Sequence, residues 1–270
     1  MSELERTWRI DAEFFQRHHL DIERKLAGNQ CESVARVAIV SDGNHFSITD
    51  SFVDEGVPYY RGQDAVGNFF IEQATPRKIT EEAFKRKYMH RSHLQQGDVL
   101  LSIIGTVGET SLVKTEQEAT CSCKLAILRS KGINPEYLST YLSSGIGHSL
   151  TERWKRGAVQ TGILLEDMDQ LPVPRFEFGL ESRVAEVIDR AYQSLEAGRQ
   201  ASNNTEITIL SVLGLGGWSV PEPLSYVCSK GDVFSVGRLD AEFQQPKYDA
   251  LLAELSSRFS IEDLSTQVSF

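Results

Sequence analysis

Two segments of this 270-residue chain carry nearly the same eight residues. Residues 9–16 read RIDAEFFQ and residues 238–245 read RLDAEFQQ, so six positions are identical. Each copy precedes a stretch with helical spacing, LDIERKL or YDALLAEL. Repeats mark duplicated structural units, but a separation of 229 residues (238 minus 9) is far too long for a solenoid. We therefore predict one large module beginning near residue 8 and a second beginning near residue 238.

The first module has the pattern of a small mixed α/β domain. Short apolar runs bounded by Gly, Asp and Pro predict strands, and these are VPYYR, DVLLSII, TSLVK and CKLAILR. Thr80, followed by Glu81 and Glu82, predicts the start of a short helix. Asn134-Pro135-Glu136 predicts another helix start. The two prolines of LPVPR (171–175) prevent a helix from running through, so we expect the globular part to end there.

A long helix is predicted to follow. Apolar residues recur with helical spacing from Leu180 and resume through Leu213, with Asn203–Asn204 as a weak point and Gly214–Gly217 as the stop. A helix of this length spans about 50 Å. Pairing with another helix, in this chain or a second one, is favoured over simple packing on its own domain. The predicted interface residues are Leu180, Val184, Val187, Ile188, Ala191 and Leu195.

These patterns together predict an α/β (α+β) fold with three parts. We expect a globular domain with a mixed β-sheet and short helices over residues 1–175. A long spacer or dimerisation helix is expected over 176–214, and the incomplete start of a second repeat over 215–270. The chain is then either a fragment or a natural half-length protein, and the sequence leaves both open.

The charge distribution is uneven along the chain. The net charge is −10, but residues 56–160 carry 14 Lys and Arg against 10 Asp and Glu, a balance of +4. The remaining residues carry 14 against 28, a balance of −14. A mildly basic middle suits a protein that gets part of its DNA affinity from a partner, although a solvated surface would show the same lysines. The basic clusters are Arg77, Lys78, Lys85, Arg86, Lys87 and Arg91, and Arg153, Lys155 and Arg156.

The motifs of several enzyme classes are absent from the sequence. It has no G-x-x-x-x-G-K-[ST] phosphate loop, no G-x-S-x-G elbow and no Asn-Pro-Pro or Asp-Pro-Pro methyltransferase loop. The four cysteines are irregularly spaced and form no zinc set. No apolar run is long enough to cross a bilayer, and the charged N-terminus lacks the apolar stretch of a secretory signal. We therefore expect a non-catalytic, cytoplasmic protein without a metal site or a cofactor of its own.

Two loop segments have residues suited to reading DNA. GVPYYRGQDA (56–65) and RWKRGAVQTG (153–162) combine arginines, glutamines, aromatic residues and glycines. Arginine pairs with guanine and glutamine with adenine in the major groove, while other side chains hold phosphates. With the basic clusters, the candidate DNA contacts are Tyr59, Tyr60, Arg61, Gln63, Lys85, Arg86, Lys87, Arg91, Arg153, Trp154, Lys155, Arg156 and Gln160.

The order of these motifs resembles a known family. VPYYRGQD, GDVLLSIIGTVGE, CKLAILR and GAVQTGILLEDMDQLPVPRF, followed by a long helix, are similar to the target-recognition domain and conserved helix of type I restriction-modification specificity subunits. The recurring RxDAEFxQ segment also fits that family. The resemblance covers nearly the whole chain and is strongest at 56–65, 97–109 and 157–175.

The resemblance implies a function without catalysis in this chain. Such a subunit binds double-stranded DNA with two recognition domains, each reading half of a bipartite site. Its long helices act as spacers and dock methyltransferase subunits, which use S-adenosylmethionine. A motor-endonuclease subunit uses ATP and Mg²⁺.

This sequence departs from the family in holding one recognition domain. Two chains paired through their helices would restore the two-domain layout and read a palindrome of identical half-sites. Two other readings stay open. The chain could be a detached targeting piece of a single-chain methyltransferase-nuclease, or a protein-interaction scaffold that works through its long helix.

Overall fold

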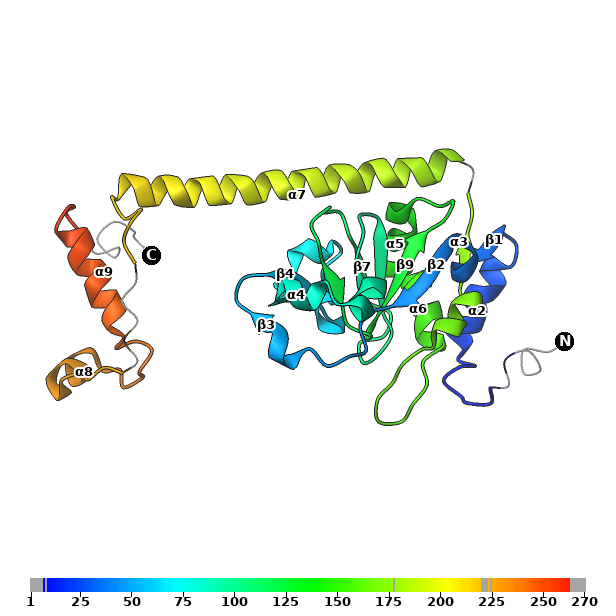
Figure 1. Ribbon diagram of the computed structural model, residues 1–270, viewed down its shortest axis with the longest axis horizontal. Coiled ribbons are helices and arrows are strands. Elements are labelled where there is room, and N and C mark those ends of the chain that lie inside the picture. Colours follow the sequence, from blue (N-terminus) through cyan, green and yellow to red (C-terminus); the bar gives the residue numbers. More distant parts are fainter. Residues whose placement is uncertain (1–6, 8, 177, 220–222, 224, 263–270) are drawn as a thin grey trace. The chain divides into compact units, whose positions relative to one another are not determined.

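The structure, a computed structural model, describes residues 7, 9–176, 178–219, 223 and 225–262. Parts of the predicted second repeat, residues 220–222, 224 and 263–270, lie outside this range. The chain forms two compact units, Met1–Gln193 and Ser194–Phe270, drawn in Figure 1.

The helices are α2 (Arg17–Leu26), α3 (Val34–Val37), α4 (Glu81–Phe84), α5 (Pro135–Ser143), α6 (Gly145–Arg153), α7 (Phe178–Val212), α8 (Lys230–Val236) and α9 (Pro246–Ser256). Short 3-10 helices cover Thr49–Ser51, Gly62–Ala65, Ile71–Gln73, Lys87–Ser92 and Leu165–Asp169. The strands are β1 (Cys31–Ser33), β2 (Ala38–Asp42), β3 (Phe52–Val53), β4 (Val57–Tyr60), β5 (Arg77–Ile79), β6 (Asp98–Ser102), β7 (Thr110–Leu112), β8 (Thr120–Cys121), β9 (Leu125–Ser130) and β10 (Pro172–Pro174).

Within the described part of the chain, the strands form three sheets. One is antiparallel throughout, in the order β2-β9-β6-β7. The second has the order β3-β5-β4-β8, with β4 and β8 parallel. β1 and β10 form an antiparallel pair, which brings the LPVPR segment back to the start of the domain. The prediction of a mixed α/β fold with short helices and a long helix is confirmed.

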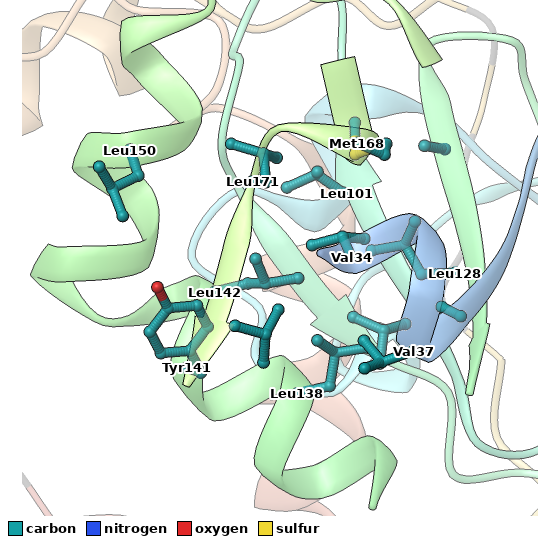
Figure 2. Packing of buried hydrophobic residues seen from close by; sticks show 14 of the residues in the cluster. Val34, Val37, Leu101, Leu128, Leu138, Tyr141, Leu142, Leu150, Met168 and Leu171 are labelled. Atoms are coloured by element: carbon teal, nitrogen blue, oxygen red, sulfur yellow. The ribbon is translucent and has the colours of Figure 1, made fainter. Parts of the chain in front are cut away.

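The central strand β6 is buried on both faces, which explains its unbroken apolar run. Val99 and Leu101 face the larger core cluster, and Leu100 faces a second cluster on the other side of the sheet. Helix α5 covers the first face. Figure 2 shows its Leu138 and Leu142 packed among the buried side chains of that cluster. Each fully buried leucine contributes about 1.5–3 kcal/mol to folding.

A third cluster lies between the sheet containing β5 and the helix that follows it. Ile79, Ala83 and Met89 are its most buried members, each with 0% of its surface exposed. The Thr80 hydroxyl accepts a hydrogen bond from the Ala83 amide at 3.2 Å, so the predicted helix start at Thr80 is confirmed. This small layer carries the basic stretch between residues 77 and 91.

The first turns of α7 pack on the same unit. Val184, Ile188 and Tyr192 lie against the larger core cluster, four residues apart on one helix face. The Tyr192 ring lies 5.0 Å from that of Phe70. The helix continues without a break through Asn203–Asn204, and all residues from 197 to 209 are exposed. No helix in the described ranges is long and apolar enough to cross a membrane.

The two copies of the repeat fold alike locally. Arg9 and Arg238 each form a forked pair with an aspartate two residues later, Asp11 or Asp240. A four-residue turn follows in both copies, and then a helix, α2 or α9. The repeat seen in the sequence is therefore a repeat of structure.

Candidate nucleic-acid interface

The loop Arg156–Gly162 projects from the first unit after α6. Its ends are joined by two backbone hydrogen bonds of 2.9 Å, between the amide and carbonyl of Arg156 and those of Gly162. Figure 1 shows the loop at the lower edge of the domain, on the side away from the start of α7. Val159 at its tip is fully exposed, and Gln160 is exposed beside it. The loop thus presents an apolar and an amide side chain from a closed base.

A glycine allows this loop to close. Gly157 has a φ of +107°, in the left-handed region that disfavours other residues. A Cβ at this position would lie 2.4 Å from the Gln160 carbonyl oxygen. Both observations mean that only glycine fits here without moving the backbone.

The loop is tied to the turn that follows β6. Ile104 forms a β-bridge with Gly162, and the Gly105 amide donates to the Thr161 carbonyl at 3.0 Å. The Ile163 amide donates to the Ile103 carbonyl at 2.9 Å. The GTVG turn that the sequence places after β6 therefore supports the loop, and its Thr106 is exposed.

The Arg61–Gln63 segment lies beside the end of β6, near the same turn. A Cβ on Gly62 would lie 3.3 Å from the Ser102 Oγ and 3.4 Å from the Lys124 Cβ. Asp64 fixes the turn by accepting a hydrogen bond of 2.7 Å from the Arg61 amide. Gln63 and Lys124 are both exposed at this point. Lys124 was missed by the sequence analysis because it is a single cation outside the basic clusters.

A further turn extends this surface from Lys124 toward the basic stretch. The Cys123 amide donates to the Asn44 carbonyl at 3.0 Å, and the Asn44 amide to the Cys121 carbonyl at 2.8 Å. Two residues earlier, Asp42 forms an ion pair with Arg91. We use the term convergent edge for the surface made by residues 42–46, 61–63, 85–91, 104–106 and 123–124 and by the loop Arg156–Gly162.

The exposed charge on the convergent edge is mostly positive. Lys85, Arg86, Lys87, Arg91, Lys124 and Arg156 are exposed. The carboxylates of Asp42 and Asp64 belong to residues with 7% exposure each. Some of these cations are already paired, for example Lys85 with Glu81 at 2.7 Å and Arg156 with Asp167 at 2.5 Å. The Lys85–Glu81 pair is exposed on both sides, so it is weak and can be exchanged for a phosphate contact, whereas the partner of Arg156 is the buried Asp167.

Four predicted DNA contacts lie in the core instead. Tyr59, Tyr60, Arg153 and Trp154 have exposures of 6, 4, 2 and 6%. Burial raises the pKa of both tyrosines, in keeping with their places in two different core clusters. These side chains are unavailable to a partner at the surface. The other nine residues are exposed or partly exposed.

Arg153 has a structural partner set that explains its burial. Its Nε donates to the Phe14 carbonyl at 2.8 Å, and its guanidinium lies 4.1 Å from the centre of the Phe14 ring. It also forms an ion pair with Glu23 of α2. Trp154 packs edge-on against Phe14, with ring centres 5.0 Å apart. The repeated RIDAEF segment therefore packs, through Phe14, against the buried residues Arg153 and Trp154 of the RWKR run.

The predicted helix-interface residues divide between two environments. Val184 and Ile188 pack against the core of the first unit. Leu180, Val187 and Leu195 are 45, 52 and 38% exposed, and Ala191 is also exposed. Among the described residues, no group of three His, Cys, Asp or Glu side chains could hold a metal ion.

No protein-family model and no curated protein matches the chain. Several solved structures match it. One, described as the structural basis underlying complex assembly and conformational transition of the type I R-M system, is 19% identical, with a TM-score of 0.46 over 72% of this chain and 50% of that chain. The HsdS subunit from Thermoanaerobacter tengcongensis is 18% identical, with a TM-score of 0.44 over 67% of this chain and 45% of that chain.

A third match is the type IIG restriction endonuclease BpuSI. It is 12% identical, with a TM-score of 0.48 over 69% of this chain and 30% of that chain. The chain thus spans half or less of the length of each of these structures. The matches to the type I R-M system and to the HsdS subunit extend over about 70% of this chain at low identity.

Proposed function

We propose that this chain is a non-catalytic DNA-recognition subunit of a type I restriction-modification complex. It reads one half of a bipartite site with the convergent edge. Its long helix is the spacer that docks methyltransferase subunits, and the complex works in the cytoplasm. The sequence motifs, the closed loop and the charge of the convergent edge support this proposal.

One observation carries the proposal. Segments separated by about a hundred residues in sequence, Arg61–Gln63 and Arg156–Gly162, both lie beside residues 102–105, the first through Gly62 against Ser102 and the second through backbone hydrogen bonds. Each contains an exposed glutamine, Gln63 or Gln160, and cations flank both. At protein–DNA interfaces, amide side chains commonly contact base edges and cationic side chains commonly contact phosphates.

The proposed roles follow from exposure and chemistry. Gln63 and Gln160 read base edges, and Val159 makes an apolar contact such as one with a thymine methyl group. Lys124, Arg61 and Arg156 hold phosphates near these bases, with Lys155 at the root of the loop. The basic stretch Lys85, Arg86, Lys87 and Arg91 contacts the backbone farther along the duplex.

The chemistry belongs to partner subunits in this proposal. A methyltransferase subunit supplies S-adenosylmethionine and methylates adenine, and a motor-endonuclease subunit supplies ATP hydrolysis and cleavage. A homodimer formed through α7 would place two recognition domains on one site. Its target would then be an interrupted palindrome.

The first test is to express the chain with a type I methyltransferase subunit from the same genome in methylation-free cells. Methylated adenines are then mapped genome-wide. An interrupted palindrome is the expected motif. An asymmetric motif would refute the homodimer of half-subunits, and a lack of methylation with no copurification would refute the proposed function.

The second test uses two lysines at opposite ends of β9. Lys124 precedes the strand on the convergent edge, and Lys131 follows it, about 20 Å away along six residues. Lys124→Ala is expected to reduce the slope of log K against log salt concentration by about 1. Lys131→Ala is expected to leave the slope unchanged. Equal slopes for both variants would remove the convergent edge from the DNA interface.

A further inference from the structure

Arg9 forms hydrogen bonds with the two residues that precede the loop Arg156–Gly162. Its guanidinium donates one hydrogen bond to the Trp154 carbonyl at 3.2 Å and one to the Lys155 carbonyl at 2.9 Å. These two carbonyls immediately precede the loop. A residue near the start of the chain therefore fixes the backbone from which the loop departs.

Asp11 and Phe14 hold Arg9 in place. The Asp11 carboxylate accepts two hydrogen bonds from Arg9, from Nε at 2.8 Å and from a terminal nitrogen at 2.5 Å. The guanidinium also lies 4.6 Å from the centre of the Phe14 ring, and Phe14 is completely buried. A bidentate pair of this type fixes direction as well as position. We use the term N-terminal clasp for Arg9, Asp11 and Phe14.

The space beside this contact is hollow. A cavity of about 740 Å³ lies between the N-terminal segment and the loop, lined by residues that include Gln16, His18, Lys155, Gly157 and Thr161. Packing on this side therefore does little to hold the loop. Arg9 and Lys155, which one of these hydrogen bonds joins, both line the cavity.

We infer that Arg9, fixed by Asp11, is a positioning residue that sets the direction of the loop Arg156–Gly162. This inference rests on the proposed function for its consequence in DNA recognition. The loop is closed at its own base by the Arg156–Gly162 hydrogen bonds and is tied on one side to the turn after β6, so the two residues before it provide the second anchor of its direction. Loss of the Arg9 hydrogen bonds would leave the closing bonds of the loop intact but remove one of its two anchors, which weakens base reading more than phosphate binding.

The second copy of the repeat provides a matched control within the same chain. Arg238 donates to Asp240 at 2.8 and 3.0 Å, and its guanidinium lies 4.4 Å from the Phe243 ring centre. Phe243, however, is 39% exposed, whereas Phe14 is completely buried. The same local geometry thus forms without the buried surroundings of the N-terminal clasp.

The experiment compares Arg9→Lys with Arg238→Lys in the full chain. Lysine keeps the charge but loses the fork that reaches Asp11 and two carbonyls. Hydrogen exchange at the Gly105 and Ile163 amides, which tie the loop to the strand and turn beside it, is expected to be about tenfold faster in Arg9→Lys and unchanged in Arg238→Lys. Affinity for the methylated motif is expected to fall about tenfold in Arg9→Lys, with little change for unrelated duplex DNA.

Other outcomes would overturn the inference. Unchanged exchange at both amides in Arg9→Lys would show that the hydrogen bonds from Arg9 do not position the loop. Equally accelerated exchange throughout the first unit would show that Arg9 acts only on global stability. If Arg9→Lys does not fold, the same measurement on Asp11→Asn decides. Faster loop exchange in Arg9→Lys, together with a wild-type chain that binds no DNA, would support the positioning role and refute the proposed function.

Discussion

His19 is a buried histidine that was not among the candidate residues predicted from the sequence. It lies on α2 with 6% of its surface exposed, and its Nδ1 is 3.0 Å from the Ser149 Oγ on α6. Burial, and then the nearby His18 and Arg153 charges, lower its pKa from 6.5 to about 4. The neutral ring is therefore the form that joins α2 to α6.

This shift predicts how stability depends on pH. The folded pKa lies below the unfolded one, so the unfolded state takes up the proton first as the pH falls. Stability is expected to fall by on the order of 2 kcal/mol between about pH 6.5 and pH 4, and not to fall further from this group below pH 4. Urea unfolding of wild type and His19→Gln at several pH values measures this. The variant should lack this part of the dependence.

The exposed His90 serves as the control for that series. His90→Gln is expected to keep the wild-type dependence, because its removal leaves the contact between His19 and Ser149 in place. A His19→Gln variant with the same pH dependence as wild type would refute the assignment.

Residue type alone could not separate core from surface in the RWKR run. Arg153 and Arg156 have the same chemistry and stand three residues apart, yet one is 2% exposed and the other lies on the convergent edge. Arg153 is still within α6, and its side chain reaches Phe14 and Glu23. Arg156 has left the helix. The sequence could place both near one surface but could not show that the repeated N-terminal segment covers Arg153.

At the scale of elements, Lys114 ties the start of α7 to the domain. Its Nζ lies 2.5 Å from the Asp189 Oδ1 on α7 and 2.9 Å from the Glu136 Oε1 on α5. Burial alone would lower the pKa of Lys114, but the hydrogen bonds to Asp189 and Glu136 outweigh it and raise the pKa. One cation therefore bridges two helices.

Removing this cation should loosen the helix start. Lys114→Met leaves two facing carboxylates and is expected to cost about 1–3 kcal/mol, less than the loss of a fully buried pair. Hydrogen exchange in α7 up to Gln193, together with urea unfolding, measures the effect. Lys85→Met, which removes an exposed pair with Glu81, should change neither. Identical exchange in the two variants would contradict the bridging role.

Elements with a local signal were predictable from sequence. The runs DVLLSII and CKLAILR became β6 and β9, and Asn134-Pro135-Glu136 begins α5. α6 was not predicted, because glycines at 145 and 147 interrupt its apolar spacing and disfavour a helix. The β1–β10 pair could not be predicted from the sequence either, because it joins Cys31 to Pro174 across most of the domain. Contacts of that range leave no local pattern.

At the scale of the whole molecule, the part of α7 from residue 197 to 209 has no buried face among the described residues. Ile207 and Ile209 are 65 and 52% exposed there, and Leu195 before them is 38% exposed. Isolated helices of this kind are marginal in water, and an apolar partner surface stabilises them. We therefore expect self-association through α7.

Leu195→Asp tests this expectation. Sedimentation equilibrium is expected to show a concentration-dependent dimer for wild type and an association at least about tenfold weaker for the variant, because a carboxylate would have to be desolvated in the interface. Ile146→Asp, at an exposed position of α6, is the control and should dimerise as wild type does. A monomeric wild type at high concentration would exclude the homodimer.

The way the loop Arg156–Gly162 is built has a consequence for evolution. Its shape is held by main-chain hydrogen bonds and by Gly157, while the side chains of residues 158–160 are exposed. Substitutions at these three positions therefore cost little folding free energy. In lineages that profit from new target sequences, selection can act on these side chains one mutation at a time while the scaffold stays the same.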